Sequence, residues 1–317
     1  MSKKHVVIWL LLIASLGVAL ILGMSLGSER LSIFDLDGTE SAIFFDIRFP
    51  RVFLGACVGA SLAAAGASLQ ALLRNPLAEP YLLGVSNGAA LGTMLAFVFF
   101  EQFVFARPLL AFGGAGLATF TVYQMARSRA GMNVERLVLS GVIVTTFLSS
   151  IIVLLTSVLD AARLRGFTFW LLGDLSQATT SGFYLTLASA VFGTFVLTSQ
   201  ARPLNLMMIG ERDALDFGVE AGRVRMIVFG IASLLVGTAV AASGSVGYVG
   251  LIVPHLVRLA IGSDNRLVIP FSALAGAIFV VLADTLARTA IAPRELPVGA
   301  ITALIGAPVF IYLLRRN

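Results

Sequence analysis

The sequence predicts an all-α, polytopic membrane protein with about ten transmembrane helices, and three observations support this fold class. Hydrophobic residues make up 58% of the 317 residues, and the mean hydropathy is +0.96. Charged residues make up only 12%, whereas soluble domains carry roughly 25%. Apolar runs near the roughly 20 residues that cross a bilayer recur along the whole chain. Residues 1–317 are therefore expected to form a single transmembrane domain.

Ten apolar segments are predicted to span the membrane. The first follows two lysines but is too long for the core of a signal peptide, and no small-residue cleavage pattern follows it, so it is interpreted as a retained helix. The eighth is short for a full crossing and follows a glycine-rich stretch. In chain order the predicted spans are Val6–Gly27, Val52–Leu73, Leu82–Phe100, Leu109–Met125, Leu137–Leu159, Phe183–Thr198, Met226–Ala242, Tyr248–Ile261, Val268–Ala290 and Val298–Leu314.

The composition excludes a cytoplasmic enzyme, a disordered protein and a nucleic-acid binder. The 22 basic residues are scattered in ones and twos, so no basic patch could follow a phosphate backbone. The single cysteine, Cys57, rules out an internal disulfide. His5 and His255 are the only histidines, which leaves little for a metal site. No catalytic residue, resident metal or cofactor is predicted.

The distribution of basic residues predicts that both termini lie in the cytoplasm. With ten crossings, fourteen of the 22 basic residues fall on the side of the N-terminus and eight on the other side. An excess of Lys and Arg marks cytoplasmic loops. An even number of spans also returns the chain to the side on which it started.

A short internal similarity predicts an inverted repeat. Residues 58–66 (VGASLAAAG) and 236–244 (VGTAVAASG) are identical at five of nine positions. The repeat unit would hold five spans, an odd number, so the two halves would lie upside down relative to each other. Inverted repeats are typical of transporters, in which the pathway lies at the repeat interface.

A glycine-rich stretch predicts a break in a helix at membrane depth. Gly244, Gly247 and Gly250 alternate there with serines. Non-helical backbone at that depth is tolerated only where it faces protein or a water-filled cavity. The stretch is therefore expected to line a path, whereas most other glycines are interpreted as helix-packing residues.

Charged residues inside the predicted spans are few. Asp284 and Arg288 are four residues apart, so they are expected to pair on one helix face. His255 is interpreted as a packed, hydrogen-bonded side chain. Ion-coupled carriers generally need titratable groups in the pathway, so the scarcity of such groups argues against secondary transport. An ion-coupled carrier that uses Asp284 remains an alternative, whereas an intramembrane enzyme lacks a catalytic set and a passive channel lacks a ring of charge.

The largest predicted cytoplasmic loop covers about residues 200–225. Its stretch Arg212–Phe217 predicts a short helix that Gly218 ends. Such a charged helix suits docking of another protein, although a solvated loop is the alternative. The chain has no Gly-x-x-x-x-Gly-Lys-[Ser/Thr] motif and its only lysines are Lys3 and Lys4, so any ATP must be bound by a partner.

Arginines lie near the predicted outer ends of two spans. Arg48 and Arg51 precede the second span, and Arg288 lies in the ninth. They either extend to the membrane interface or receive carboxylates from a soluble partner.

Several runs of residues resemble the FecCD family, the ABC-importer permeases for iron–siderophore, haem and vitamin B12. The resemblance covers about residues 48–316, with Asn265 where the family often has His and Phe49 where it often has Leu. The matching runs are Arg48–Arg51 (RFPR), Gln70–Pro80 (QALLRNPLAEP), Leu83–Ala89 (LGVSNGA), Gly247–His255 (GYVGLIVPH), Leu282–Asp284 (LAD), Glu295–Gly299 (ELPVG) and Gly306–Phe310 (GAPVF).

The resemblance implies a type II ABC importer in the bacterial cytoplasmic (inner) membrane. In that arrangement the permease forms a homodimer in membrane lipid, two cytoplasmic ABC ATPase subunits bind ATP, and a periplasmic or lipid-anchored substrate-binding protein delivers the cargo. The cargo is expected to be an iron chelate (siderophore or haem) or cobalamin, and an iron chelate is favoured on family size alone. No nucleic-acid partner is expected.

The resemblance also assigns roles to residues. It implies that the binding protein docks at Arg48, Arg51 and Arg288. Asn75 and Leu77 match the inner gate, and Gly244, Gly247 and Gly250 are expected on the translocation path. The loop that couples to the ATPase would contain Gly210, Glu211, Arg212, Asp213, Ala214, Leu215, Asp216 and Gly218.

Overall fold

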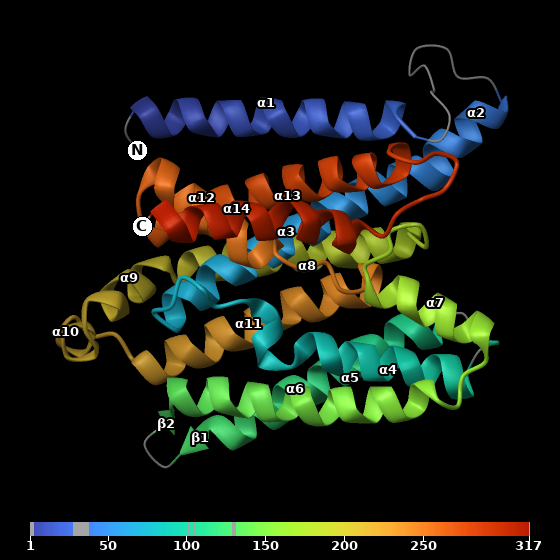
Figure 1. The fold of residues 1–317 in the computed structure, drawn as a ribbon. Helices are drawn as coiled ribbons and strands as arrows, with labels where there is room; N and C mark the ends of the chain where they lie inside the picture. Colours follow the sequence, from blue (N-terminus) through green and yellow to red (C-terminus); the bar gives the residue numbers. More distant parts are fainter. Residues whose placement is uncertain (1–2, 28–37, 101, 104, 129–130, 317) are drawn as a thin grey trace.

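The computed structural model describes residues 3–27, 38–100, 102–103, 105–128 and 131–316. Arg30 and Arg129, which count toward the predicted charge distribution, lie outside the described residues. Within the described part, the long helices run side by side as one bundle (Figure 1). The strands found there are a short antiparallel pair, β1 (Arg127–Ser128) and β2 (Gly131–Met132).

Each of the ten predicted spans corresponds to one helix, which confirms the predicted fold class. Seven helical segments of the described chain are long and apolar enough to cross a membrane, and α4, α12 and α14 are shorter apolar helices. The ten are α1 (Lys3–Ser25), α3 (Phe49–Leu72), α4 (Val85–Phe99), α5 (Ala106–Ala126), α6 (Val134–Thr156), α8 (Thr180–Ser199), α11 (Ala221–Ser243), α12 (Val249–Ile261), α13 (Asn265–Thr289) and α14 (Val298–Arg316).

Shorter helices fill the connections between the spans, and one of them, α10, corresponds to the short helix predicted in the large loop. Polar residues interrupt their apolar faces, so none of them reads as a membrane span. They are α2 (Gly38–Ala42), the π-helix η1 (Ile43–Arg48), the 3₁₀ helix η2 (Pro80–Leu83), α7 (Ala161–Leu171), α9 (Ala201–Ile209) and α10 (Glu211–Asp216).

The second span begins earlier than predicted. A continuous helical segment runs from residue 40 through η1 into α3 and ends at residue 72. A proline normally marks the start of a helix, because it has no N–H to donate. Here the wider π turn carries the helix past Pro50, with the Phe49 N–H donating to the Phe44 carbonyl. Arg48 and Arg51 therefore lie inside the helical segment and not before it.

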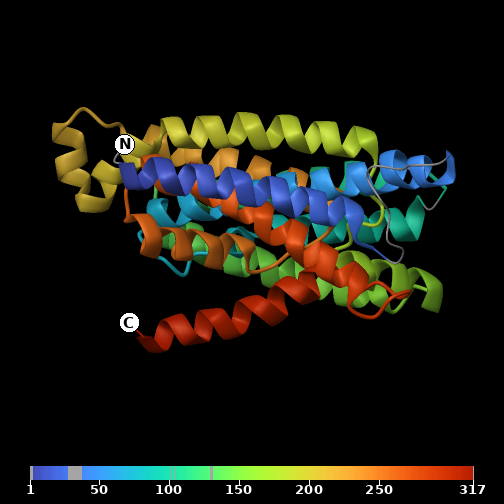
Figure 2. The same ribbon diagram turned by 90° about the horizontal axis from the view of Figure 1, so that it is seen from above.

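Both described ends of the chain lie at the same end of the bundle. The β1–β2 hairpin, α9 and α10 are at that end too, whereas α2 and α7 are at the opposite end (Figures 1 and 2). This placement agrees with an even number of crossings. Figure 2 also shows that α14 diverges from the other helices toward its C-terminal end.

Helix α3 is the centre of the bundle, with 89% of its most apolar window buried. Small residues let its neighbours approach closely. A Cβ on Gly59 would overlap the carbonyl group of Gly276 in α13, and a Cβ on Gly66 would overlap that of Gly250 in α12.

The two similar sequence segments lie in α3 and at the end of α11. These two helices pack against each other and run in opposite directions (Figure 1). Opposite directions are what an inverted repeat requires. That the two halves form such a repeat stays a prediction.

Candidate functional site

The predicted helix break is present between α11 and α12. Helix α11 ends at Ser243 and α12 begins at Val249. Gly244 and Tyr248 both adopt a φ of +67°, in the left-handed region that glycine tolerates and that tyrosine adopts rarely. The five residues between the helices therefore turn the chain sharply and leave their backbone groups outside a helical ladder.

Two other segments satisfy the backbone of the break. The Tyr81 hydroxyl accepts from the Val246 N–H at 3.0 Å and donates to the Val246 carbonyl at 2.9 Å. A Glu79 carboxylate oxygen accepts from the Tyr248 N–H at 3.2 Å. The Asp174 N–H donates to the Ser243 carbonyl at 2.7 Å. The break thus faces protein, as the rule for irregular backbone in membranes demands.

The start of α14 joins the same cluster of non-helical segments. The Val298 N–H donates to the Gly173 carbonyl at 3.0 Å. The Ser86 hydroxyl at the start of α4 donates to the Ser245 hydroxyl at 3.2 Å. Connections that lie far apart in the sequence therefore meet around residues 244–248. Hydrogen bonds link them there, so a displacement of one connection would strain its bonds to the others.

The predicted gate residues lie on the connection that leads into this cluster. The Leu77 N–H donates to the Asn75 side-chain oxygen at 2.9 Å, and both residues are exposed. Glu79 and Tyr81, which follow on the same connection, hold the break. Asn75 and Leu77 are thus linked to the glycines of the break, although they do not contact them directly.

A polar pair fastens α3 to α12 close to the break. The Gln70 amide donates to the carbonyls of Gly250 and Leu251 at 3.2 and 3.1 Å, and its oxygen accepts from Arg258. Arg258 also donates to the Ala67 carbonyl at 3.1 Å. His255, on the same helix, was expected to be hydrogen-bonded, but its buried Nε2 has no partner among the described residues.

The short helix predicted in the large loop is present as α10, displaced by one residue. Gly210 precedes it and Gly218 follows it with a φ of +75°. The Val219 N–H donates to the Ala214 carbonyl at 2.9 Å and closes the end of the helix. Ala214 is buried, whereas Leu215 is 61% and Phe217 73% exposed. The helix therefore presents apolar side chains at one end of the bundle.

The predicted coupling segment is joined to the bundle by an ion pair and by a polar cluster. Glu211 of α10 pairs with Arg225 of α11. In α9, the Asn205 side-chain oxygen accepts from the Asn265 N–H at 3.0 Å and from its amide at 2.8 Å. The Asn205 amide donates to Asp264 at 2.7 Å. The ion pair connects α10 to α11, and the Asn205 bonds connect α9 to the start of α13. They give Asn265 a role that the sequence left open.

Asp264 in the α12–α13 connection is held in its charged form. Its carboxylate caps α13 and contacts the Arg266 guanidinium at 2.7 Å. The hydrogen bonds from Arg266, and then the one from Asn205, lower the pKa of Asp264 to about 2. The Asp264 carboxylate therefore stays ionised at neutral pH.

The three arginines predicted to dock a partner are buried in the structure. Arg48, Arg51 and Arg288 are 5%, 7% and 4% exposed. Arg51 donates to Asp284 at 2.9 Å and to Glu295 at 2.8 Å. The predicted pair of Asp284 and Arg288 is confirmed, at 2.9 Å.

Two of these arginines, Arg48 and Arg288, also hold the end of α1. Arg288 donates to the carbonyls of Gly23 and Leu26 at 2.8 and 3.2 Å. Arg48 donates to those of Met24 and Ser25 at 2.9 and 3.0 Å. The last carbonyls of a helix have no partner within the helix and carry partial negative charge. Arg48 and Arg51 therefore neither extend to the membrane interface nor face a partner in this structure, because internal acceptors draw them inward.

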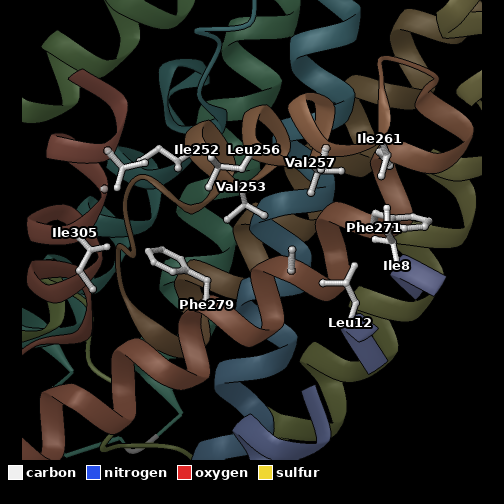
Figure 3. Close-up of a pocket in the computed structure, with 14 residues that line it drawn as sticks. Ile8, Leu12, Ile252, Val253, Leu256, Val257, Ile261, Phe271, Phe279 and Ile305 are labelled. Carbon is white, nitrogen blue, oxygen red and sulfur yellow. The ribbon is translucent and has the colours of Figure 1, made fainter. Parts of the chain in front are cut away.

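An apolar cavity of about 280 Å³ lies where α1, α12, α13 and α14 meet (Figure 3). Phe279, Ile252 and Ile305 point into it from three different helices. All of its lining residues are apolar or glycine. Among the described residues, no group of three His, Cys, Asp or Glu side chains could hold a metal ion.

Comparisons with known proteins identify the family that shares this architecture. The FecCD transport family matches residues 3–316. The chain is 44% identical to a cobalamin import system permease protein of Halobacterium salinarum, over 89% of this chain and 76% of the relative. It is 38% identical to the hemin transport system permease protein HmuU of Yersinia pestis, over 97% of this chain and 93% of the relative.

A solved structure has nearly the same fold. It is described as an inward-facing conformation of a putative metal-chelate type ABC transporter. The TM-score is 0.88 at 31% identity, with 96% of this chain and 98% of the other covered. The chain belongs to the FecCD transport family and is a membrane-spanning permease subunit of an ABC transporter.

Proposed function

We propose that this permease imports an iron chelate or cobalamin through a homodimer, powered by two ATPase subunits and supplied by a substrate-binding protein. The observation that carries the proposal is the exposed apolar tip of α10. Helix α10 packs against α9, which the Asn205 cluster joins to α13. ATP-driven movement of a subunit seated on this tip would displace α9 and α10, and the packed helices would follow as rigid bodies.

The end of the bundle that carries α10 is proposed to face the cytoplasm. The fourteen basic residues that the sequence assigns to one side support this orientation, because Lys and Arg accumulate in cytoplasmic loops. Both termini would then be cytoplasmic. In bacteria the membrane would be the inner membrane.

The proposed path runs past the non-helical cluster around residues 244–248. Gly244, Gly247 and Gly250 would form part of its wall, and Asn75 and Leu77 would form the inner gate. Hydrogen bonds through Glu79 and Tyr81 couple the gate segment to the wall. A wall with few charges binds weakly, which favours release of a bulky cargo.

The second copy is proposed to pack along α14. This helix diverges from the bundle (Figure 2) and leaves Leu304, Ile311 and Tyr312 exposed. The apolar cavity in Figure 3 opens beside it. A disulfide formed by Leu304→Cys in a Cys57→Ser background would support this interface.

The binding protein is proposed to dock at Arg48, Arg51 and Arg288. Docking requires that these guanidinium groups exchange their internal acceptors for carboxylates of the binding protein. Glu295 is 40% exposed and holds Arg51 from the outer side. A carboxylate of the binding protein would have to displace it. Glu295→Gln is therefore expected to tighten docking, whereas unchanged docking would argue against Arg51 as a contact.

The role of α10 can be tested by co-purification with the ATPase. Phe217→Ser is expected to weaken capture of the ATPase about tenfold or more, as loss of a buried apolar anchor does at other interfaces. Val158→Ser, an equally exposed apolar residue on the α6–α7 connection, is the matched control. Equal capture by both variants would contradict the proposal.

The cargo can be identified with the permease, its ATPase and its binding protein together in proteoliposomes. The relatives described above carry permease names for cobalamin and hemin. Uptake of a ferric siderophore, haem or cobalamin, each offered at equal concentration, is expected to be selective for one of them.

A further inference from the structure

A second groove lies between α5 and α11, outside the path and the docking faces. Its volume is about 390 Å³. Aromatic rings line it from α5, and small residues form its floor. The lining residues are Phe112, Ala115, Gly116, Thr119, Phe120, Tyr123, Met226, Phe229, Gly230, Ser233, Leu234 and Gly237.

The length of the groove matches one leaflet of a bilayer. Phe112 and Tyr123 are eleven residues apart on α5, which is about 16 Å at 1.5 Å per residue. The hydrocarbon core is about 30 Å thick. A groove that is about half as long as the core is thick fits a single acyl chain. A transmembrane helix of a partner would instead contact the full height of the bundle.

One end of the groove has an amphipathic border. The Tyr123 ring stacks on Phe229 with centroids 6.3 Å apart, and its hydroxyl contacts the Met226 sulfur at 3.9 Å. Tyrosine prefers the level of the lipid headgroups, where its ring is apolar and its hydroxyl is hydrated. This end of the groove therefore lies near the membrane surface.

Two exposed arginines lie one helical turn beyond this border. Arg127 ends α5 as its C-cap residue, four residues after Tyr123, and Arg223 lies three residues before Met226 on the same face of α11. Both therefore lie beyond the Tyr123 end of the groove. Neither makes an ion pair with a residue of the described ranges. Strand β1, which contains Arg127, and the start of α11, which contains Arg223, both lie at the end of the bundle that carries α10 (Figure 1).

We propose that this groove binds an acyl chain of an anionic glycerophospholipid, whose phosphate Arg127 and Arg223 hold. Basic residues at the cytoplasmic surface attract anionic headgroups, and paired guanidinium groups suit phosphate oxygens. The apolar lining excludes a polar solute from the groove itself.

The glycines in the groove offer a direct test. A Cβ on Gly116 or on Gly230 would meet nothing within 4 Å, so a larger side chain there fills the groove without displacing the helices. Gly17, which lies on α1 and outside this lining, also has open space around it. Gly230→Leu therefore blocks the site, and Gly17→Leu is the matched control.

The experiment is native mass spectrometry of the full-length chain with phosphatidylglycerol or phosphatidylcholine of equal chain length. Wild type and Gly17→Leu are expected to retain phosphatidylglycerol several-fold more than phosphatidylcholine. The double variant Arg127→Gln/Arg223→Gln should lose this preference, whereas Arg202→Gln, on α9 at the same end, should keep it. Gly230→Leu should retain one lipid fewer of either kind.

Three results would overturn the proposal. They are equal retention of the two lipids by wild type, an unchanged preference in the double arginine variant, and a Gly230→Leu variant that changes the oligomeric state and not the lipid count. The last result would identify a second copy as the occupant. None of these readouts depends on ATPase coupling, so the test is separate from that of the proposed function.

Discussion

Asp284 is the shared acceptor of two buried arginines, and it explains how so apolar a bundle keeps charges inside. Its carboxylate receives Arg51 at 2.9 Å and Arg288 at 2.9 Å. Burying a charge is costly unless it is paired and hydrogen-bonded. The sequence predicted the pair with Arg288 because four residues make one helical turn. It could not predict Arg51, which comes from a helix 233 residues away.

Removing this acceptor should destabilise the bundle strongly. Asp284→Asn leaves two buried guanidinium groups without their carboxylate, a loss of about 3–5 kcal/mol. Glu295→Gln removes a half-exposed acceptor and should cost about 0–1 kcal/mol. Thermal unfolding in detergent distinguishes the two, and equal losses would mean that the network is not the anchor described here.

Acid should release the polar cluster around Asp264. The pKa of this carboxyl is lowered from 3.8 to about 2 in the folded chain. A lowered folded-state pKa stabilises the protein above the ordinary pKa, and the contribution disappears as the pH falls through the folded value. Wild type should therefore lose stability between about pH 4 and pH 2 more steeply than Asp264→Asn. Parallel unfolding curves for the two proteins over that range would contradict the assignment.

At the scale of elements, the close approach of α3 to its neighbours organises the bundle. Gly66 lies against Gly250 with no room for a Cβ. Hydropathy located all ten spans, because crossing a membrane requires about 20 apolar residues. It missed η1 and α9, whose Arg48 and Asn205 are satisfied by contacts that only the folded chain brings together. It also missed α7, whose polar residues make local contacts.

Adding one methyl group at this contact should separate α3 from α12. Gly66→Ala is expected to cost about 1–3 kcal/mol, the usual range for overpacking. Gly17→Ala in α1 meets open space and should be neutral or slightly stabilising. Chemical or thermal unfolding of the two variants in the same detergent provides the comparison, and similar stabilities would show that the contact can relax.

At the scale of the whole molecule, long helices and a non-helical centre connect the two ends of the bundle. The glycine-rich stretch located the helix break, and the charged loop located α10, from sequence alone. That these segments serve as path and coupling site, and Asn75 and Leu77 as gate, stays a prediction. The buried environment of Arg48, Arg51 and Arg288 could not be predicted, since their partners are carbonyls of α1 and acids of α13 and residue 295. Local spacing gives no information on such long-range contacts.

The central claim is that this chain provides the path and that its partners provide the energy and the cargo. Uptake into proteoliposomes tests it most directly, with the permease alone, with its ATPase and binding protein, and with an imposed proton gradient. We expect concentrative uptake only when all partners and ATP are present, and no response to the gradient. Uphill uptake by the permease alone, or uptake driven by the gradient without ATP, would contradict the account.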